Sequence, residues 1–217
     1  MPELIKLQAG ELPSRETLAR AAEAVSRGGV VAFPTDTVYG LGTSAASRAG
    51  VERICRIKGR SPDKPLPLLA ASAEALRPWV EWTPQAETLA ARFWPGGLTM
   101  VLKASAEGRS LACCREGTLA VRVPDHPVAL ALLEGAPAPW AQTSANGSGE
   151  PPLADGAAVA RRFGGELAMS IDCGPTPGRE STVADATAVP VRVLREGMIP
   201  ASAILARRFL FVCTGNS

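Results

Sequence analysis

Residues 29–41 constrain the fold of this chain more than any other stretch of its sequence. Positions 30–33 form a short apolar run between Gly29 and Pro34, which is typical of a buried β-strand. Polar side chains follow at once, at Thr35, Asp36, Thr37 and Tyr39. Open α/β sheets bind ligands just beyond the ends of their strands. The segment therefore predicts an α/β sheet with a ligand site directly after this strand.

The apolar spacing elsewhere predicts alternating helices and strands. Helices are expected from Ser14 to position 27 and over residues 49–58, 86–93, 128–133 and 157–163. Strands are expected over residues 4–7, 66–71, 98–103, 118–123, 139–143, 168–172, 181–185 and 191–194. Helices alternate with strands at first, and strands dominate later. This order predicts an α/β fold with a twisted mixed sheet, parallel and antiparallel, flanked by helices, with the last two strands forming a hairpin.

Composition narrows the class of protein further. The chain has 217 residues, of which 46% are hydrophobic and 20% charged, and this fits one soluble α/β domain. The formal net charge of +2 excludes a uniform polycation, so any positive field must come from local clustering. Five cysteines without a leader peptide favour a reducing cytoplasm, and a single histidine argues against structural zinc. No apolar run is long enough to predict a membrane span.

A basic cluster follows the second expected helix. Five cations lie within twelve residues, at Arg53, Arg56, Lys58, Arg60 and Lys64. For Arg53 and Arg56, two interpretations are equally good: they lie on a solvent-exposed helix face, or they have a functional role. The Lys58-Gly-Arg60 step is different, because glycine ends the helix and places both cations in a loop. Loop cations beside a polar turn suit a polyphosphate ligand.

Three further polar segments each allow two interpretations. An arginine inside a strand is costly unless it is paired or turned toward a ligand, so Arg122 either pairs with Asp36 or Asp125 or faces a ligand. The segment 142–146 alone is better explained as an ordinary turn, and Arg195 alone as a surface arginine. We interpret His126 as a residue that packs at the start of a helix, and Cys113-Cys114 as a pair of small loop residues.

Taken together, these segments resemble the YrdC family, the threonylcarbamoyl-AMP synthases of tRNA modification. Five motifs keep the family order over roughly residues 17–200, and the resemblance implies a YrdC-like domain over residues 1–206 with an open basic cleft. The sequence departs from the family pattern at three positions. Ser61 stands where the family usually has proline, and Pro67 is a second departure. Pro152 stands where some relatives have a serine that contacts the nucleotide.

The resemblance implies a nucleotidyltransferase that makes threonylcarbamoyl-AMP and pyrophosphate from L-threonine, bicarbonate and ATP. Mg²⁺ is expected to accompany the nucleotide. The product would go to the complex that transfers the threonylcarbamoyl group to adenosine 37 of tRNAs reading ANN codons, giving t6A. Direct contact with tRNA or double-stranded RNA is left open, and no membrane partner is expected.

The resemblance also assigns roles to individual residues. The expected ATP contacts are Lys58, Arg60, Lys64, Thr118, Ser144, Asn146 and Arg195, with Lys58 and Arg60 catalytic through electrostatic stabilisation. The expected threonine contacts are Thr37, Tyr39, Arg122, Gln142 and Ser181. No general base is assigned, and Asp36 is an unproven candidate.

Two other functions compete with this interpretation. A module that binds double-stranded RNA or tRNA would use the same basic concave face, show salt-sensitive binding and turn over no ATP. The carbamoyltransferase of hydrogenase maturation carries a related domain, but it needs further domains with zinc-binding cysteines that this sequence lacks.

The last residues, 207–217, suggest a second domain. An apolar run leads into Cys213-Thr-Gly-Asn, which resembles the first strand and phosphate loop of low-molecular-weight protein tyrosine phosphatases. The sequence stops before the arginine that this loop requires, so no phosphatase activity is expected from it. We expect a two-domain fusion cut near its junction, and a chance pentapeptide after a strand is the alternative.

Overall fold

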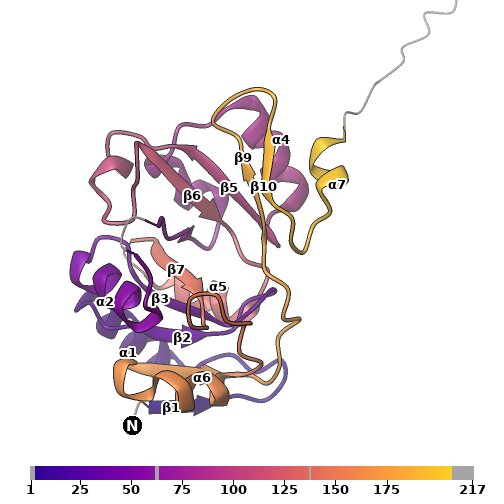
Figure 1. Cartoon of the computed structure of the whole chain (residues 1–217). Helices are drawn as coiled ribbons and strands as arrows, with labels where there is room; N and C mark the ends of the chain where they lie inside the picture. Colours follow the sequence, from indigo (N-terminus) through magenta and orange to yellow (C-terminus); the bar gives the residue numbers. More distant parts are fainter. Residues whose placement is uncertain (1–2, 62–63, 137, 207–217) are drawn as a thin grey trace, which may run out of the picture.

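The computed structural model describes residues 3–61, 64–136 and 138–206 (Figure 1). The segment predicted to resemble a phosphatase, 207–217, lies outside the described residues. The described strands form one ten-stranded sheet in the order β1-β8-β2-β3-β7-β4-β6-β5-β9-β10. Their bounds are β1 Glu3–Lys6, β2 Val31–Phe33, β3 Gly40–Ser44, β4 Leu68–Leu69, β5 Leu98–Lys103, β6 Thr118–Arg122, β7 Trp140–Ser144, β8 Met169–Asp172, β9 Thr182–Asp185 and β10 Arg192–Arg195.

The sheet is mixed, as the sequence predicts. Pairs β1–β8, β2–β8, β4–β6 and β5–β9 are parallel, and the other neighbouring pairs are antiparallel, including the β9–β10 hairpin. The helices are α1 Arg15–Ser26, α2 Arg48–Lys58, α3 Ala73–Leu76, α4 Pro84–Phe93, α5 Pro127–Glu134, α6 Gly156–Phe163 and α7 Ala201–Leu205, with 3₁₀ turns η1 Arg77–Trp79, η2 Gly108–Ser110 and η3 Gly164–Glu166. Two short helices, α3 and α7, were not predicted, because four or five residues carry too little periodicity.

Strand β2 is apolar on both sides because helices cover both faces of the sheet. Val31 and Phe33 belong to a cluster completed by α1 and α5, whereas Ala32 belongs to a larger cluster with α2 and α6. Successive side chains of a strand point to opposite faces. The continuous apolar run in the sequence is therefore explained by burial on both faces.

The strand β3 is absent from the sequence-based prediction because its residues, GLGTS, include two glycines. The structure explains the glycine at position 42. A Cβ atom there would lie 2.7 Å from the Phe33 ring and 2.8 Å from the Trp140 ring. These rings meet edge to face with centroids 5.5 Å apart, so Gly42 makes room for an aromatic pair under the sheet.

Strand β4 joins the two halves of the sheet. Leu68 pairs with Val121 of β6 in parallel and with Ala141 of β7 in antiparallel fashion. The predicted strand over 66–71 shortens to two residues, because Pro65 and Pro67 have no N–H to donate to a ladder. Within the described part of the chain, no helix is long and apolar enough to cross a membrane.

Replacing Leu68 by alanine tests the role of β4. The side chain is fully buried, so Leu68→Ala is expected to lower the free energy of unfolding by about 2–5 kcal/mol. The control is Leu12→Ala, because Leu12 is 54% exposed and its loss should cost under about 0.5 kcal/mol. Urea denaturation measures both, and equal effects would contradict this account of β4.

Candidate functional site

Two adjoining cavities lie where β2, β6, β7, β9 and the end of α2 meet. The larger has a volume of about 450 Å³ and the smaller about 80 Å³. Arg60, Ser144 and Glu180 line both, so the cavities share a boundary. The predicted residues that line one or both cavities are Thr37, Lys58, Arg60, Arg122, Gln142, Ser144, Asn146, Ser181 and Arg195.

The turn between β2 and β3 is fixed by its own hydroxyl groups. The Thr35 hydroxyl donates to the carbonyl of Val38 at 2.6 Å, and it accepts hydrogen bonds from the backbone N–H groups of Thr37 and Val38. The Thr35 and Thr37 hydroxyls are 2.9 Å apart, and because Thr35 has spent its only hydrogen, Thr37 is the donor. Thr37 can therefore offer a ligand only a hydrogen-bond acceptor.

Arg122 is buried at the end of β6 and is held at three points. Its Nε donates to the carbonyl of Gly96 at 2.9 Å, Nη1 to the Thr37 hydroxyl at 2.9 Å, and Nη2 to Asp36 Oδ1 at 2.5 Å. Burial lowers the pKa of this guanidinium and Asp36 raises it, and an arginine stays protonated throughout. The predicted pairing with Asp36 is present. Arg122 also lines the smaller cavity, and three contacts leave two of its five N–H donors for a ligand.

Lys58 ends α2 and reaches into the larger cavity. Its Nζ donates to the Ser144 carbonyl and, at 2.7 Å each, to the carbonyl and side-chain oxygen of Asn146. Burial and neighbouring Arg60 lower the pKa of this ammonium to about 8. Gly59 follows in the left-handed conformation with φ 59°, which ends the helix as the sequence predicts. The 144–146 turn is therefore folded around a cation.

Arg60 carries a buried N–H donor that has no partner among the described residues. Its Nη2 donates to the carbonyl of Pro65 at 2.9 Å, but its Nε has no hydrogen-bond partner among the described residues. Burial is the main reason that the pKa of this guanidinium is lowered. A buried N–H without a partner is costly, so its place at the boundary of the cavities indicates a site for an oxygen-rich ligand.

Glu180, Ser181 and Arg195 close the opposite wall. Arg195 Nη1 donates to Glu180 Oε2 at 2.7 Å, and Nη2 donates to the Ser181 carbonyl at 3.0 Å. The Ser181 hydroxyl lies 2.9 Å from the Thr99 hydroxyl. Glu180 and Thr99 were both missed by the sequence analysis. A threonine inside the apolar run 98–103 was the available signal for Thr99, and the acidic side chain within Gly-Arg-Glu-Ser was the signal for Glu180.

The larger cavity carries both signs of charge. Its cations are Lys58, Arg60 and Arg179, and its carboxylates are Glu150, Glu180 and Glu196. The described residues include no group of three or more His, Cys, Asp or Glu side chains placed to hold a metal ion. The described part of the cleft therefore supplies carboxylates but no preformed metal cage.

Three predicted residues do not line either cavity. Tyr39 is fully buried, and its hydroxyl donates to the Gly174 carbonyl at 2.7 Å and accepts from the Cys173 N–H at 3.1 Å. Thr118 begins β6 and donates to the carbonyl of Arg115, at the far end of the strand from Arg122. Lys64 is exposed in the loop before β4. Pro152, one of the departures from the family pattern, lines the larger cavity and has no hydroxyl to offer a ligand.

His126 and Cys113 have structural surroundings, as predicted. His126 is the N-cap of α5, and its Nδ1 accepts from the N–H of Val128 at 3.3 Å. Burial lowers the pKa of this histidine. Cys113 is buried in the main core cluster, and the cysteines at 55, 113, 114 and 173 are all free thiols. None of these residues lines the two cavities.

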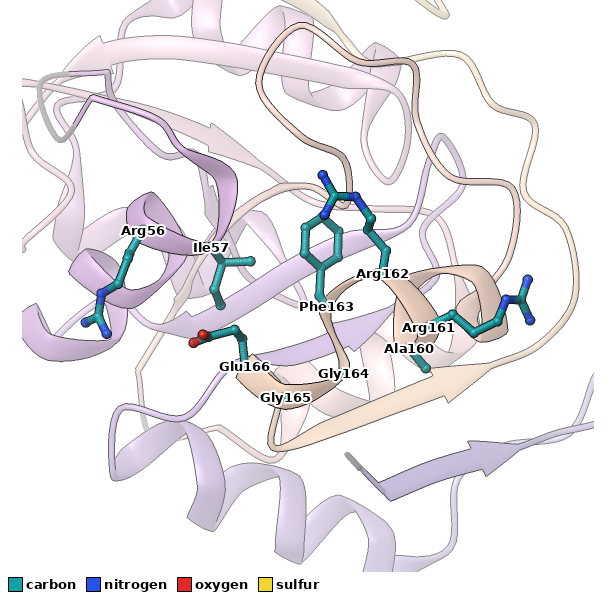
Figure 2. A pocket seen from close by; sticks show the side chains of 9 residues that line it. All are labelled: Arg56, Ile57, Ala160, Arg161, Arg162, Phe163, Gly164, Gly165 and Glu166. Carbon is teal, nitrogen blue, oxygen red and sulfur yellow. The ribbon is translucent and has the colours of Figure 1, made fainter.

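A cavity of about 590 Å³ between α2 and α6 contains none of the predicted site residues. Figure 2 shows that its charged side chains do not converge: Arg56 and Arg161 point away to opposite sides. The Arg162 guanidinium lies 5.4 Å from the Phe163 ring centroid, and Arg162 also pairs with Glu150. Volume alone therefore does not identify the functional site, which is better marked by convergent polar groups.

The Sua5/YciO/YrdC family model, which carries the description "Telomere recombination", matches residues 23–197. The chain belongs to this family. The match spans the elements that build the cleft, from α1 to the segment after β10. The mixed sheet with flanking helices predicted from the sequence is confirmed.

Curated family members are similar over most of this chain. A threonylcarbamoyl-AMP synthase of Pyrococcus abyssi is 44% identical over 182 residues, which is 83% of this chain and 54% of that protein. The chain thus spans about half the length of that relative. An Escherichia coli O9:H4 threonylcarbamoyl-AMP synthase is 36% identical over 84% of this chain and 97% of its own length.

A solved family structure is also similar. The crystal structure of P. abyssi Sua5 complexed with L-threonine superposes with a TM-score of 0.84 at 41% sequence identity. The similarity covers 93% of this chain and 59% of that one. The shared fold is therefore the domain described here, including the strands that carry the cleft.

The position of Tyr39 leads to a prediction about this family member. Replacing Tyr39 by phenylalanine leaves the Gly174 carbonyl and the Cys173 N–H without their partner. Tyr39→Phe is therefore expected to lower the free energy of unfolding by about 1–3 kcal/mol, as measured by urea denaturation. An unchanged unfolding midpoint would show that the hydroxyl does not anchor the segment after β8.

Proposed function

We propose that this chain forms threonylcarbamoyl-AMP and pyrophosphate from L-threonine, bicarbonate and ATP. The observation that carries the proposal is the pairing of two sites across one boundary. A fixed arginine fork in the small cavity suits a carboxylate, and the positive charges of Lys58 and Arg60 in the adjoining cavity suit phosphates. The names of the curated relatives support the same reaction.

The residues have distinct tasks in this reaction. Arg122 holds the threonine carboxylate, and Ser181 and Thr99 offer hydroxyls to its side chain. The neutral amine attacks the carbon of bicarbonate and a water molecule leaves, which gives a carbamate. A carbamate oxygen then attacks the α-phosphorus, and pyrophosphate leaves. Negative charge grows on the phosphoryl and leaving oxygens, and Lys58, Arg60 and Arg195 stabilise that charge. The buried Nε of Arg60 gains a partner in this step.

Mg²⁺ fits the cleft only as a companion of the nucleotide. Mg²⁺ is usually held by one or two carboxylates together with substrate phosphates. The cleft offers single carboxylates such as Glu150 and Glu196. When bound, the ion would neutralise phosphate charge.

The product would then pass to the complex that modifies adenosine 37 of tRNA. We include direct contact between this chain and tRNA in the proposal.

Pyrophosphate release tests the reaction. Release by the wild type is expected to require L-threonine, bicarbonate and ATP together. Arg122→Lys keeps the charge but loses the fork, so KM for threonine should rise about tenfold or more. Arg192→Lys is the control, because the Arg192 side chain is 74% exposed and lies outside the cavities. Threonine-independent release, or RNA binding without turnover, would contradict the proposal.

The lowered pKa of Lys58 predicts a pH dependence for ATP binding. The ammonium is charged below about pH 8 and loses its proton above it, so ATP affinity should be highest below pH 8 and fall as pH rises through that value. Calorimetric titration between pH 7 and 9.5 measures this change. Lys58→Gln should bind ATP weakly with a flat profile, and an equal decline in that variant would assign the dependence to another group.

A further inference from the structure

The smaller cavity contains one carboxylate among its described lining residues, that of Glu180. Its other charged lining groups are the guanidiniums of Arg60, Arg122 and Arg195. The remaining lining residues are neutral. The charges that line this cavity of about 80 Å³ suit a small ligand that carries charge of both signs.

An α-amino acid is such a ligand, and this step rests on the proposed function. Its carboxylate has a partner in the donors of Arg122 that the protein leaves free. Its ammonium group needs an acceptor, because a buried charge without a partner is costly. Hydroxyls of Thr37, Thr99 and Ser181 are near, but they carry no charge. Among the described lining residues, only Glu180 can neutralise an ammonium.

Glu180 is held in a defined position. Its backbone carbonyl accepts from the N–H of Met198 at 2.8 Å. A Cβ atom at Gly197 would lie 2.2 Å from that carbonyl oxygen, so glycine permits the close approach. The ion pair with Arg195 uses Oε2, and a carboxylate has further acceptor sites on both oxygens. Glu180 can therefore bind Arg195 and an ammonium group together.

A purely structural role is the competing explanation. The Glu180–Arg195 pair connects the segment before β9 to the end of β10, and this alone could account for the glutamate. Two observations favour a ligand. Glu180 lines both cavities, and its side chain stays about one-third exposed, at 36%. An exposed ion pair contributes little to stability, typically under about 1 kcal/mol.

We propose that Glu180 is the specificity residue for the α-ammonium group of the substrate amino acid. It binds the positive end of the zwitterion while Arg122 binds the negative end. The nitrogen that becomes the carbamate is thereby placed at the boundary between the two cavities, beside Arg60 and Ser144. A ligand that lacks the amine gains nothing from Glu180 and is repelled by it.

Binding of matched ligands tests this assignment. L-threonine and (R)-3-hydroxybutyrate, which is threonine without its amino group, are titrated by calorimetry into the wild type and Glu180→Gln. The variant is expected to bind L-threonine about tenfold or more weakly. Its affinity for (R)-3-hydroxybutyrate should be unchanged or higher. Equal weakening of both ligands, or of neither, would overturn the proposal.

Two further variants secure the result. Glu87→Gln is the matched control, because Glu87 also pairs with an arginine, Arg77 at 2.8 Å, and lies outside both cavities. It should bind both ligands as the wild type does. Glu180→Asp keeps the charge and should keep the preference for the amine. Loss of that preference in a variant with the wild-type melting temperature would overturn the proposal.

The binding experiment also separates this proposal from the proposed reaction. If Glu180→Gln selectively loses affinity for L-threonine but the wild type releases no pyrophosphate, the role of Glu180 is supported and the proposed reaction is overturned. Threonine-dependent release together with equal weakening of both ligands would support the reaction and overturn the role of Glu180.

Discussion

The buried ion pair between Arg122 and Asp36 is the interaction on which the site depends. A guanidinium inside a sheet is tolerated only when its charge and its N–H groups have partners. Asp36, Thr37 and the Gly96 carbonyl supply them, and they come from two parts of the chain far apart in sequence. The pair thus fixes the turn after β2 against the end of β6. The orientation of the arginine fork is settled before any ligand arrives.

The other cations of the cleft are prepared in a similar way. Lys58 is surrounded by oxygens of the 144–146 turn, and Arg195 is held by Glu180 and the Ser181 carbonyl. Such contacts restrain long side chains whose entropy would otherwise oppose binding. They also limit repulsion between neighbouring positive groups of the cleft. Preorganisation of this kind is the main contribution that a protein makes to phosphoryl transfer.

Much of the architecture could be predicted from sequence, because helices α1, α2 and α4 and strand β5 have clear periodicity and caps. The strand β3 could not, since Gly42 is explained only by the Phe33 and Trp140 rings and Gly40 only by the Gln142 side chain, which are distant in sequence. The roles of the site residues were implied by the family resemblance and stay predictions. Most of these residues line the two cavities, whereas Tyr39, Thr118 and Lys64 do not, since the position of a side chain relative to a cavity depends on segments distant in sequence.

The position of β4 has a consequence for energetics. The two walls of the cleft belong to opposite halves of one sheet, which meet through Leu68 and Leu69. A molecule that touches both walls is therefore linked thermodynamically to the integrity of the whole domain. A ligand bound in the cleft therefore stabilises the hydrogen bonds of β4 against opening. A change that loosens these hydrogen bonds weakens ligand binding by the same free energy.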